Sequence, residues 1–186
     1  MDFFMIRTDL FVNPIWEGNI QLNNKLLSHF FDKSKELNYI APGKSSQNGS
    51  EQTQDLCISK EFSDTKKRIE NYYIMETGLK VEIGNAWICK NITGSFNDLH
   101  LHGNSDISGV YYISAPNDCG GLVFRNPNDC VHMADNFIKD PCWWGKYTKK
   151  VKTGMIIFFP SYLPHKTEVN KSKKPRLALS FNMRYI

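Results

Sequence analysis

The sequence lacks the segments that mark membrane and secreted proteins. No apolar run reaches the roughly 20 residues that a membrane-spanning helix needs. Residues 1–13 carry acidic side chains and have neither the apolar core nor the cleavage site of a signal peptide. We therefore expect an intracellular, cytoplasmic protein with no membrane partner.

Cysteine pairs and strong charge are also missing. The five cysteines are odd in number, scattered and without a CxxC pair, which argues against a disulfide framework or a zinc knuckle and favours reduced thiols. The net charge of +4 is small, and no nucleic-acid-binding motif is present. Composition therefore gives no basis for a nucleic-acid partner.

The chain of 186 residues suits a single domain, 1–186, with a helical preface and loop over 1–79 and a strand-rich core over 80–186. An apolar stripe at helical spacing predicts a helix over Asn19 to Leu37. Residues 41–55 are polar and rich in turn formers, which predicts a loop. A second helix is expected from a cap at Ser63 or Asp64 to about Thr77, with Gly78 ending it.

From Lys80 the pattern changes to strands. Alternation in one segment predicts a half-buried strand that contains Val81, Ile83, Asn85, Trp87 and Cys89. Further short strands are expected over Ser108 to Ser114, Gly121 to Arg125, Met155 to Phe159 and Leu177 to Met183. Many short strands between turn residues favour a β-sandwich or barrel.

One long insertion interrupts the strands. It runs from Asn126 to Lys150 and contains Trp143 and Trp144. Because long loops in compact domains often cover functional sites, we expect it to act as a lid, with Phe158 and Tyr162 also able to wall a pocket.

Three of the five histidines occupy two short windows. His100 and His102 are two residues apart, so both face the same side of an extended segment, and His165 follows a predicted strand and a Pro-bounded turn. Three neutral imidazoles suit a divalent first-row metal such as iron and leave positions free for other ligands. Asp106 is the nearest carboxylate and is an alternative ligand that could complete or replace part of this set.

Arg176 stands eleven residues after His165, at the start of a predicted strand. Its planar guanidinium is suited to a bidentate clamp on a carboxylate. Tyr112, on the strand that follows the histidine pair, could share that carboxylate if it faces inward, and otherwise it is a core aromatic.

Several windows together resemble a known family. They are His100–His102, Ser108–Ile113, Gly120–Phe124, Gly154–His165 and Arg176–Asn182, with a polar segment over Ser45–Asp55. The chain is similar over nearly its whole length to the 2-oxoglutarate- and iron(II)-dependent oxygenases of marine bacteria and their phages. The same order of elements recurs in prolyl hydroxylases.

This resemblance implies a mainly β, double-stranded β-helix (jelly-roll, cupin-like) fold with supporting N-terminal helices. It implies iron(II) as cofactor and 2-oxoglutarate as cosubstrate, with a chain that could be phage-encoded and act inside a bacterial host. His100 and His165 match the first and distal iron ligands, and His102 falls where the family pattern has an acid. Arg176 and Tyr112 match the residues that bind the far carboxylate of 2-oxoglutarate.

The family pattern is not met everywhere. A His-x-His pair gives a ligand set with no anionic side chain, which leaves more positive charge on the iron. Ala178 stands where some relatives have a serine after the arginine, and Ser180 could supply that contact instead. The implied reaction is hydroxylation, with no catalytic residue beyond the metal ligands and with release of succinate and CO2.

Two other classes of protein remain as alternatives. A cupin-type metalloprotein that uses no 2-oxoglutarate would have nearly the same fold, with Gly94, the histidine pair and Asp106 approximating one cupin motif and Gly154 and His165 part of the other. A non-enzymatic jelly-roll binding module would hold no metal. The sequence does not choose the substrate, small molecule or peptide, and a homodimer is conceivable because jelly-roll edges often pair.

Overall fold

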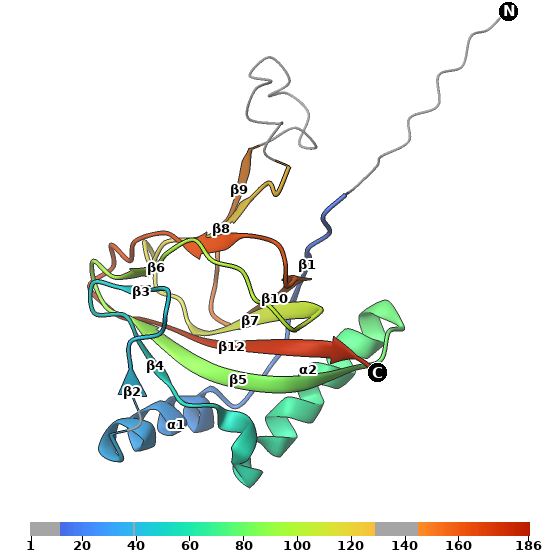
Figure 1. Cartoon of the computed structure of the whole chain (residues 1–186). Coiled ribbons are helices and arrows are strands. Elements are labelled where there is room, and N and C mark those ends of the chain that lie inside the picture. The colour runs from blue at the N-terminus through green and yellow to red at the C-terminus, as the bar shows by residue number, and fades with distance from the viewer. Residues whose placement is uncertain (1–11, 39, 129–144) are drawn as a thin grey trace, which may run out of the picture.

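The computed structural model describes residues 12–38, 40–128 and 145–186. Two antiparallel sheets carry the fold, and Figure 1 shows the larger one between the smaller sheet and two helices. The strands of the larger sheet, in spatial order, are β1 (Trp16–Asn19), β10 (Met155–Pro160), β7 (Ile107–Ser114), β12 (Arg176–Tyr185), β5 (Val81–Asn91), β4 (Glu51–Thr53) and β2 (Ile40–Ala41). The smaller sheet is β11 (His165–Thr167), β8 (Leu122–Arg125) and β9 (Lys146–Lys149), and β3 (Ser46–Gln47) pairs with β6 (Phe96–Asn97).

Each face of the larger sheet buries its own hydrophobic cluster. Helices α1 (Asn24–Glu36) and α2 (Ser63–Thr77) cover one face, where Phe31, Ile69 and Phe181 are among the buried residues. The other face meets the smaller sheet through side chains that include Phe124 and Phe159. This arrangement confirms the predicted mainly β, double-stranded β-helix fold with supporting helices.

The two helices match the sequence pattern unequally. Helix α2 ends at Thr77 as predicted, and Gly78 follows it with a left-handed φ of 73°. Its start is slightly different, because the N-cap is Phe62, without a side-chain cap hydrogen bond, and not the predicted Ser63 or Asp64. Helix α1 begins at Asn24, later than the predicted Asn19, with the Asn23 side chain accepting a hydrogen bond from the Leu26 N–H. The start was wrong because residues 16–19 pair with β10 as a strand, which the helical periodicity did not reveal.

The polar segment 41–55 is not simply a loop. Glu51 and Gln52 pair with β5, and Ser46 and Gln47 pair with β6. Tertiary hydrogen bonds therefore organise a stretch whose composition alone favours turns.

Strand β5 changes face part-way along its length. Val81 and Ile83 point into the cluster beneath the sheet, whereas Asn85, Trp87 and Cys89 line a cavity on the opposite face. The pairing of β5 with β12 slips by one residue at this point. The predicted strand is present, but its alternation does not describe one continuous face, because a β-bulge shifts the phase of the side chains.

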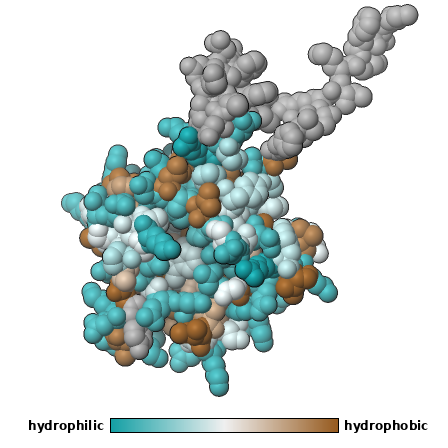
Figure 2. Space-filling view, viewed as in Figure 1, coloured by the Kyte–Doolittle hydropathy of each residue, from teal (hydrophilic) through white to brown (hydrophobic). Residues whose placement is uncertain are grey.

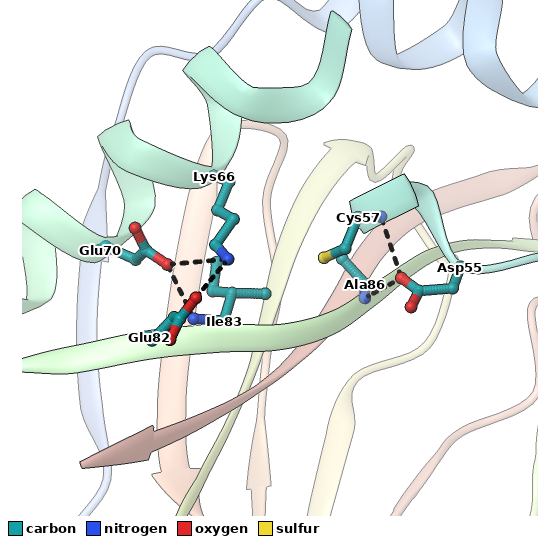
Figure 3. A network of polar contacts seen from close by, with 7 residues as sticks. All are labelled: Asp55, Cys57, Lys66, Glu70, Glu82, Ile83 and Ala86. Atoms are coloured by element: carbon teal, nitrogen blue, oxygen red, sulfur yellow. Dashed lines mark hydrogen bonds and ion pairs between the residues drawn. The ribbon is translucent and has the colours of Figure 1, made fainter. Parts of the chain in front are cut away.

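Side chains cap the edge of β5 beyond its pairing with β4. Asp55 accepts a hydrogen bond from the Ala86 N–H at 2.9 Å, and Glu70 accepts one from the Ile83 N–H at 2.7 Å. Figure 3 shows these contacts, with Lys66 between Glu70 and Glu82. The capped N–H groups keep this edge in place and so fix the strand that carries several cavity residues.

The outer surface is mixed in character. On the face in Figure 2, hydrophobic residues form small separate groups among hydrophilic ones. Within the described residues, no helix is long and apolar enough to cross a membrane. Cys57, Cys89 and Cys119 are free thiols, as expected, while Cys130 and Cys142 lie outside the described residues.

Candidate active site

The structure brings His100, His102 and His165 together. One ring nitrogen from each lies within 4.8 Å of the others. The backbones of His100 and His165 exchange two hydrogen bonds, of 3.0 and 2.9 Å, and this bridge joins the segment after β6 to the first residue of β11. Residues 65 apart in sequence are thus held as neighbours by main-chain contacts that do not depend on their side chains.

Hydrogen bonds orient two of the imidazoles. Nδ1 of His100 lies 2.7 Å from the Asp98 carbonyl oxygen, and Nδ1 of His165 lies 2.9 Å from the Leu163 carbonyl oxygen. Because a carbonyl can only accept, Nδ1 is the donor in each case and Nε2 keeps its lone pair. Backbone partners of this kind are the usual outer support of metal-binding histidines.

The site favours neutral imidazoles. Burial, reinforced by the nearby His100 ring, lowers the pKa of His165 to about 3 and that of His102 to about 4. The rings of His102 and His165 are stacked 5.2 Å apart, and Trp87 and Phe159 pack against them. At neutral pH the His102 and His165 rings are therefore neutral and able to coordinate a cation.

Asp106 lies outside this cluster. Its side chain is exposed, and Oδ2 accepts a hydrogen bond from the Tyr185 N–H at 3.0 Å. The sequence left open whether Asp106 or His102 stands with the other two histidines, and the structure groups His102 with them.

Arg176 is 1% exposed and contributes a charged group to the cavity wall. It donates from Nη1 to the Cys119 and Gly120 carbonyl oxygens and from Nη2 to Oδ1 of Asn91, at 2.8, 3.2 and 3.0 Å. Among the described residues, no carboxylate lies within ion-pairing distance of it. A buried cation held only by neutral acceptors creates a strong electrostatic preference for an anion beside it.

Tyr112 and Ser180 line the same cavity. Tyr112 faces inward from β7, where it pairs with Ala178 of β12, and within the described chain its hydroxyl has no hydrogen-bond partner. Burial raises the pKa of this hydroxyl, although the Arg176 charge lowers it, so the group stays protonated and can donate. Ser180 lies beside the buried Cys89 thiol, two residues beyond Ala178.

The cavity has a volume of about 640 Å³. Its floor is formed by three neighbouring strands of the larger sheet, whose paired residues make rows across it. The floor residues are Asn85, Trp87, Cys89 and Asn91 of β5, Arg176, Ala178, Ser180 and Asn182 of β12, and Ser108, Val110 and Tyr112 of β7. The three histidines belong to the wall of this same cavity, so the nitrogen cluster and the buried cation share one space.

The aromatic residues expected to wall the pocket are mostly elsewhere. Phe158 packs in the cluster beneath the larger sheet, and Tyr162 is 56% exposed. The assignment of Phe158 was wrong because its neighbour Phe159 takes the inward position on β10. The assignment of Tyr162 was wrong because its side chain stays at the surface, where its hydroxyl donates to Oδ1 of Asn13 at 3.2 Å. Trp143 and Trp144, with most of the proposed lid, lie outside the described residues.

Sequence reasoning missed Asn91 and did not recognise Trp87 as part of the site. Trp87 stood in a predicted strand whose inward face could not be assigned before the bulge was known. Asn91 is 2% exposed and contacts Arg176 across 85 residues of sequence. A lone asparagine carries no local signal, although its position at the end of a predicted strand could have marked it as buried.

A family model shows to which family the chain belongs. Residues 85–182, more than half of the chain, match the family described as "Putative 2OG-Fe(II) oxygenase". The chain belongs to the 2OG-Fe(II) oxygenase family. The match begins after the polar segment 45–55, so that part of the expected resemblance falls outside it.

Solved structures of this oxygenase fold are similar over most of the chain. A prolyl-4-hydroxylase from Pseudomonas putida is 16% identical, with 95% of each chain covered and a TM-score of 0.63. A viral collagen prolyl hydroxylase from Paramecium Bursaria Chlorella virus-1, in complex with 2-oxoglutarate, is 16% identical, with 92% of this chain and 96% of that chain covered and a TM-score of 0.62. The α-ketoglutarate-dependent carbocyclase SnoK from nogalamycin biosynthesis is 11% identical, with 92% and 79% covered and a TM-score of 0.67.

No curated protein matches the sequence. At these identities the solved structures establish the fold alone, and the family assignment establishes an oxidoreductase that uses iron(II) and 2-oxoglutarate. The residues present fit both groups. The three histidines offer neutral nitrogen donors, and Arg176 offers an uncompensated positive charge to a dicarboxylate.

Proposed function

We propose that this oxygenase hydroxylates a C–H bond of its substrate. In the balanced reaction, substrate R–H, 2-oxoglutarate and O2 give R–OH, succinate and CO2. The observation that carries the proposal is the joining of three histidine nitrogens and one buried, unpaired guanidinium in a single cavity. A jelly-roll binding module would need neither, and a cupin-type enzyme that uses no 2-oxoglutarate would not need the guanidinium.

In this proposal each residue has one task. His100, His102 and His165 would hold the iron, and Arg176 would bind the far carboxylate of 2-oxoglutarate. The Tyr112 hydroxyl would donate to the same carboxylate. When bound, the metal and the cosubstrate supply the activation of dioxygen by oxidative decarboxylation.

The surrounding side chains prepare the site for these groups. The rings of Phe159 and His165 pack in a T-shaped arrangement with their centroids 4.6 Å apart, which limits the water that reaches the imidazole. Ser180 lines the cavity and would offer a further hydroxyl near the cosubstrate. The cavity is larger than a five-carbon dicarboxylate requires, and the remaining part, towards Asn85 and Asn182, would receive the substrate.

Anaerobic titration of iron(II) protein with 2-oxoglutarate tests the cofactor part of the proposal. The wild type is expected to develop the weak visible charge-transfer band of a chelated 2-oxo acid, and Arg176→Ala is expected to lose it at the same ligand concentration. Arg184→Ala is the matched control, because Arg184 lies on the same strand but is exposed and donates to the Asn104 carbonyl oxygen. Absence of the band in the wild type would favour a cupin-type or non-enzymatic protein.

The metal and the reaction type need separate measurements. Iron content after gel filtration should be lost in His165→Ala, and unchanged content would overturn the assignment of that ligand. Incubation of the iron-loaded protein with a metabolite extract under ¹⁸O2 should yield a product one labelled oxygen atom heavier than its precursor. A consumed precursor whose product contains no label would instead indicate an oxidation of another kind, such as the cyclisation suggested by the name of SnoK.

A further inference from the structure

The hydrogen-bond pattern around Arg176 leaves one donor unused. Of the five N–H hydrogens of a guanidinium, Nε–H and one on Nη2 point to Oδ1 of Asn91, at 3.4 and 3.0 Å. The two hydrogens on Nη1 are donated to the carbonyl oxygens of Cys119, Gly120 and Glu168. Among the described residues, the second Nη2 hydrogen has no acceptor, so it is the donor left for a ligand in the cavity.

Asn91 is itself held in one orientation. Its Nδ2 donates to Oγ of Ser50 at 2.8 Å and to Oδ1 of Asn97 at 3.0 Å. Nδ2 of Asn97 lies 3.4 Å from Oγ of Ser45, which accepts from it. Because a guanidinium can only donate, Asn91 must turn its oxygen to Arg176, and the relay of amides behind it matches that direction.

The neutrality of Asn91 has a chemical consequence. An aspartate here could orient the guanidinium equally well, but its charge would cancel the charge of Arg176 before any ligand arrived. The Asn91 amide orients the Arg176 guanidinium and leaves its positive charge available to a ligand. The carbonyl groups of Cys119 and Gly120, which accept from Arg176, are likewise neutral. Their segment packs tightly against Glu168 at the left-handed Gly120 (φ +79°), where a Cβ would lie 2.7 Å from the Glu168 carbonyl oxygen.

We propose that Asn91 is a positioning residue for the cosubstrate. It holds Arg176 so that a single Nη2 hydrogen faces the cavity, and the far carboxylate is gripped at two points, by that hydrogen and by the Tyr112 hydroxyl. In this proposal the guanidinium would not clamp the carboxylate in a bidentate way, since most of its N–H groups donate to protein acceptors. This inference rests on the proposed use of 2-oxoglutarate at the site.

The test compares two ligands that differ only at the far end. 2-Oxopentanoate has the carbon chain and metal-chelating end of 2-oxoglutarate but lacks the far carboxylate. The ratio of the two dissociation constants, measured anaerobically on the iron(II) protein, therefore reports the carboxylate grip and cancels changes at the metal. For the wild type we expect 2-oxoglutarate to bind about 10- to 100-fold more tightly, as for charge-assisted hydrogen bonds in a buried site.

Variants of Asn91 should reduce this preference. Asn91→Ala is expected to bring the two ligands to within about threefold, by freeing the guanidinium from its orientation. Asn91→Asp, which keeps the side-chain shape, is expected to abolish the preference or to favour 2-oxopentanoate, because the new carboxylate neutralises Arg176. Asn24→Ala is the matched control: Asn24 bonds Tyr111 and the Ile113 carbonyl oxygen away from the cavity, so its loss should leave the ratio unchanged.

The outcomes distinguish a failure of the Asn91 role from a failure of the proposed use of 2-oxoglutarate. A wild type that shows no preference for 2-oxoglutarate would overturn both. A wild-type preference that persists in Asn91→Asp, with the variant folded by circular dichroism, would overturn the positioning role alone. An equal weakening of both ligands in Asn91→Ala would likewise contradict it, since only structural damage at the metal end predicts that result.

Discussion

Metal-free protein should lose stability steeply between pH 6.5 and pH 5. The cause is the pair His102 and His165, whose pKa values burial lowers to about 4 and about 3 in the folded chain. In the unfolded chain both return to about 6.5. Between these values the unfolded state binds more protons than the folded state, so protonation draws the equilibrium towards unfolding as pH falls.

The size of the effect follows from the difference in bound protons. At pH 5 each histidine is largely protonated when unfolded and neutral when folded, which costs about 2 kcal/mol per group relative to pH 7.5. Solvent reaches part of His102 and screens its share, so the pair together should remove about 3 to 4 kcal/mol. That is a large part of the roughly 5 to 15 kcal/mol by which domains are stable.

Urea unfolding of EDTA-treated protein from pH 7.5 to pH 5 measures this slope. His165→Gln removes one titrating group and should roughly halve the loss of stability that the pair causes. His29→Gln is the control, because His29 is exposed on α1 and its replacement should leave the slope unchanged. Equal slopes for the wild type and His165→Gln would refute the argument that burial keeps these imidazoles neutral.

Two further predictions concern the sheet that carries the site. Gly109→Ala should destabilise the protein by about 1–3 kcal/mol in urea unfolding, because its Cβ would lie 2.3 Å from two ring atoms of the buried Phe181. Phe181→Leu should partly relieve this in the double variant, whereas Gly103→Ala, with nothing within 4 Å of its Cβ, should cost little. Asp55→Ala should cost about 1–3 kcal/mol, since it leaves the Ala86 N–H of β5 without its acceptor, and faster hydrogen exchange at Ala86 should accompany the loss (Figure 3). An Ala86 amide as protected in the variant as in the wild type would contradict that account.

Local patterns were sufficient for much of this molecule. The presence of α2 and its end at Thr77 followed from helical spacing and a terminal glycine, both of which act within one turn of the chain. The start of α1 could not be foreseen, because residues 16–19 take their conformation from β10, more than 130 residues away. Periodicity also failed within β5, where a bulge against β12 moves Asn85 and Trp87 to the cavity face.

By itself the sequence determined which groups could do chemistry here: a His-x-His pair, a histidine after a Pro-bounded turn and an arginine on the next strand. Their types and spacings are properties of short segments, so they are visible before folding. Only the tertiary structure decided that Asp106 stays outside the histidine cluster and that Asn91 accepts hydrogen bonds from Arg176. Those contacts join residues about 80 apart, and they exist because strands β5, β7 and β12 lie side by side, an arrangement that no local pattern specifies.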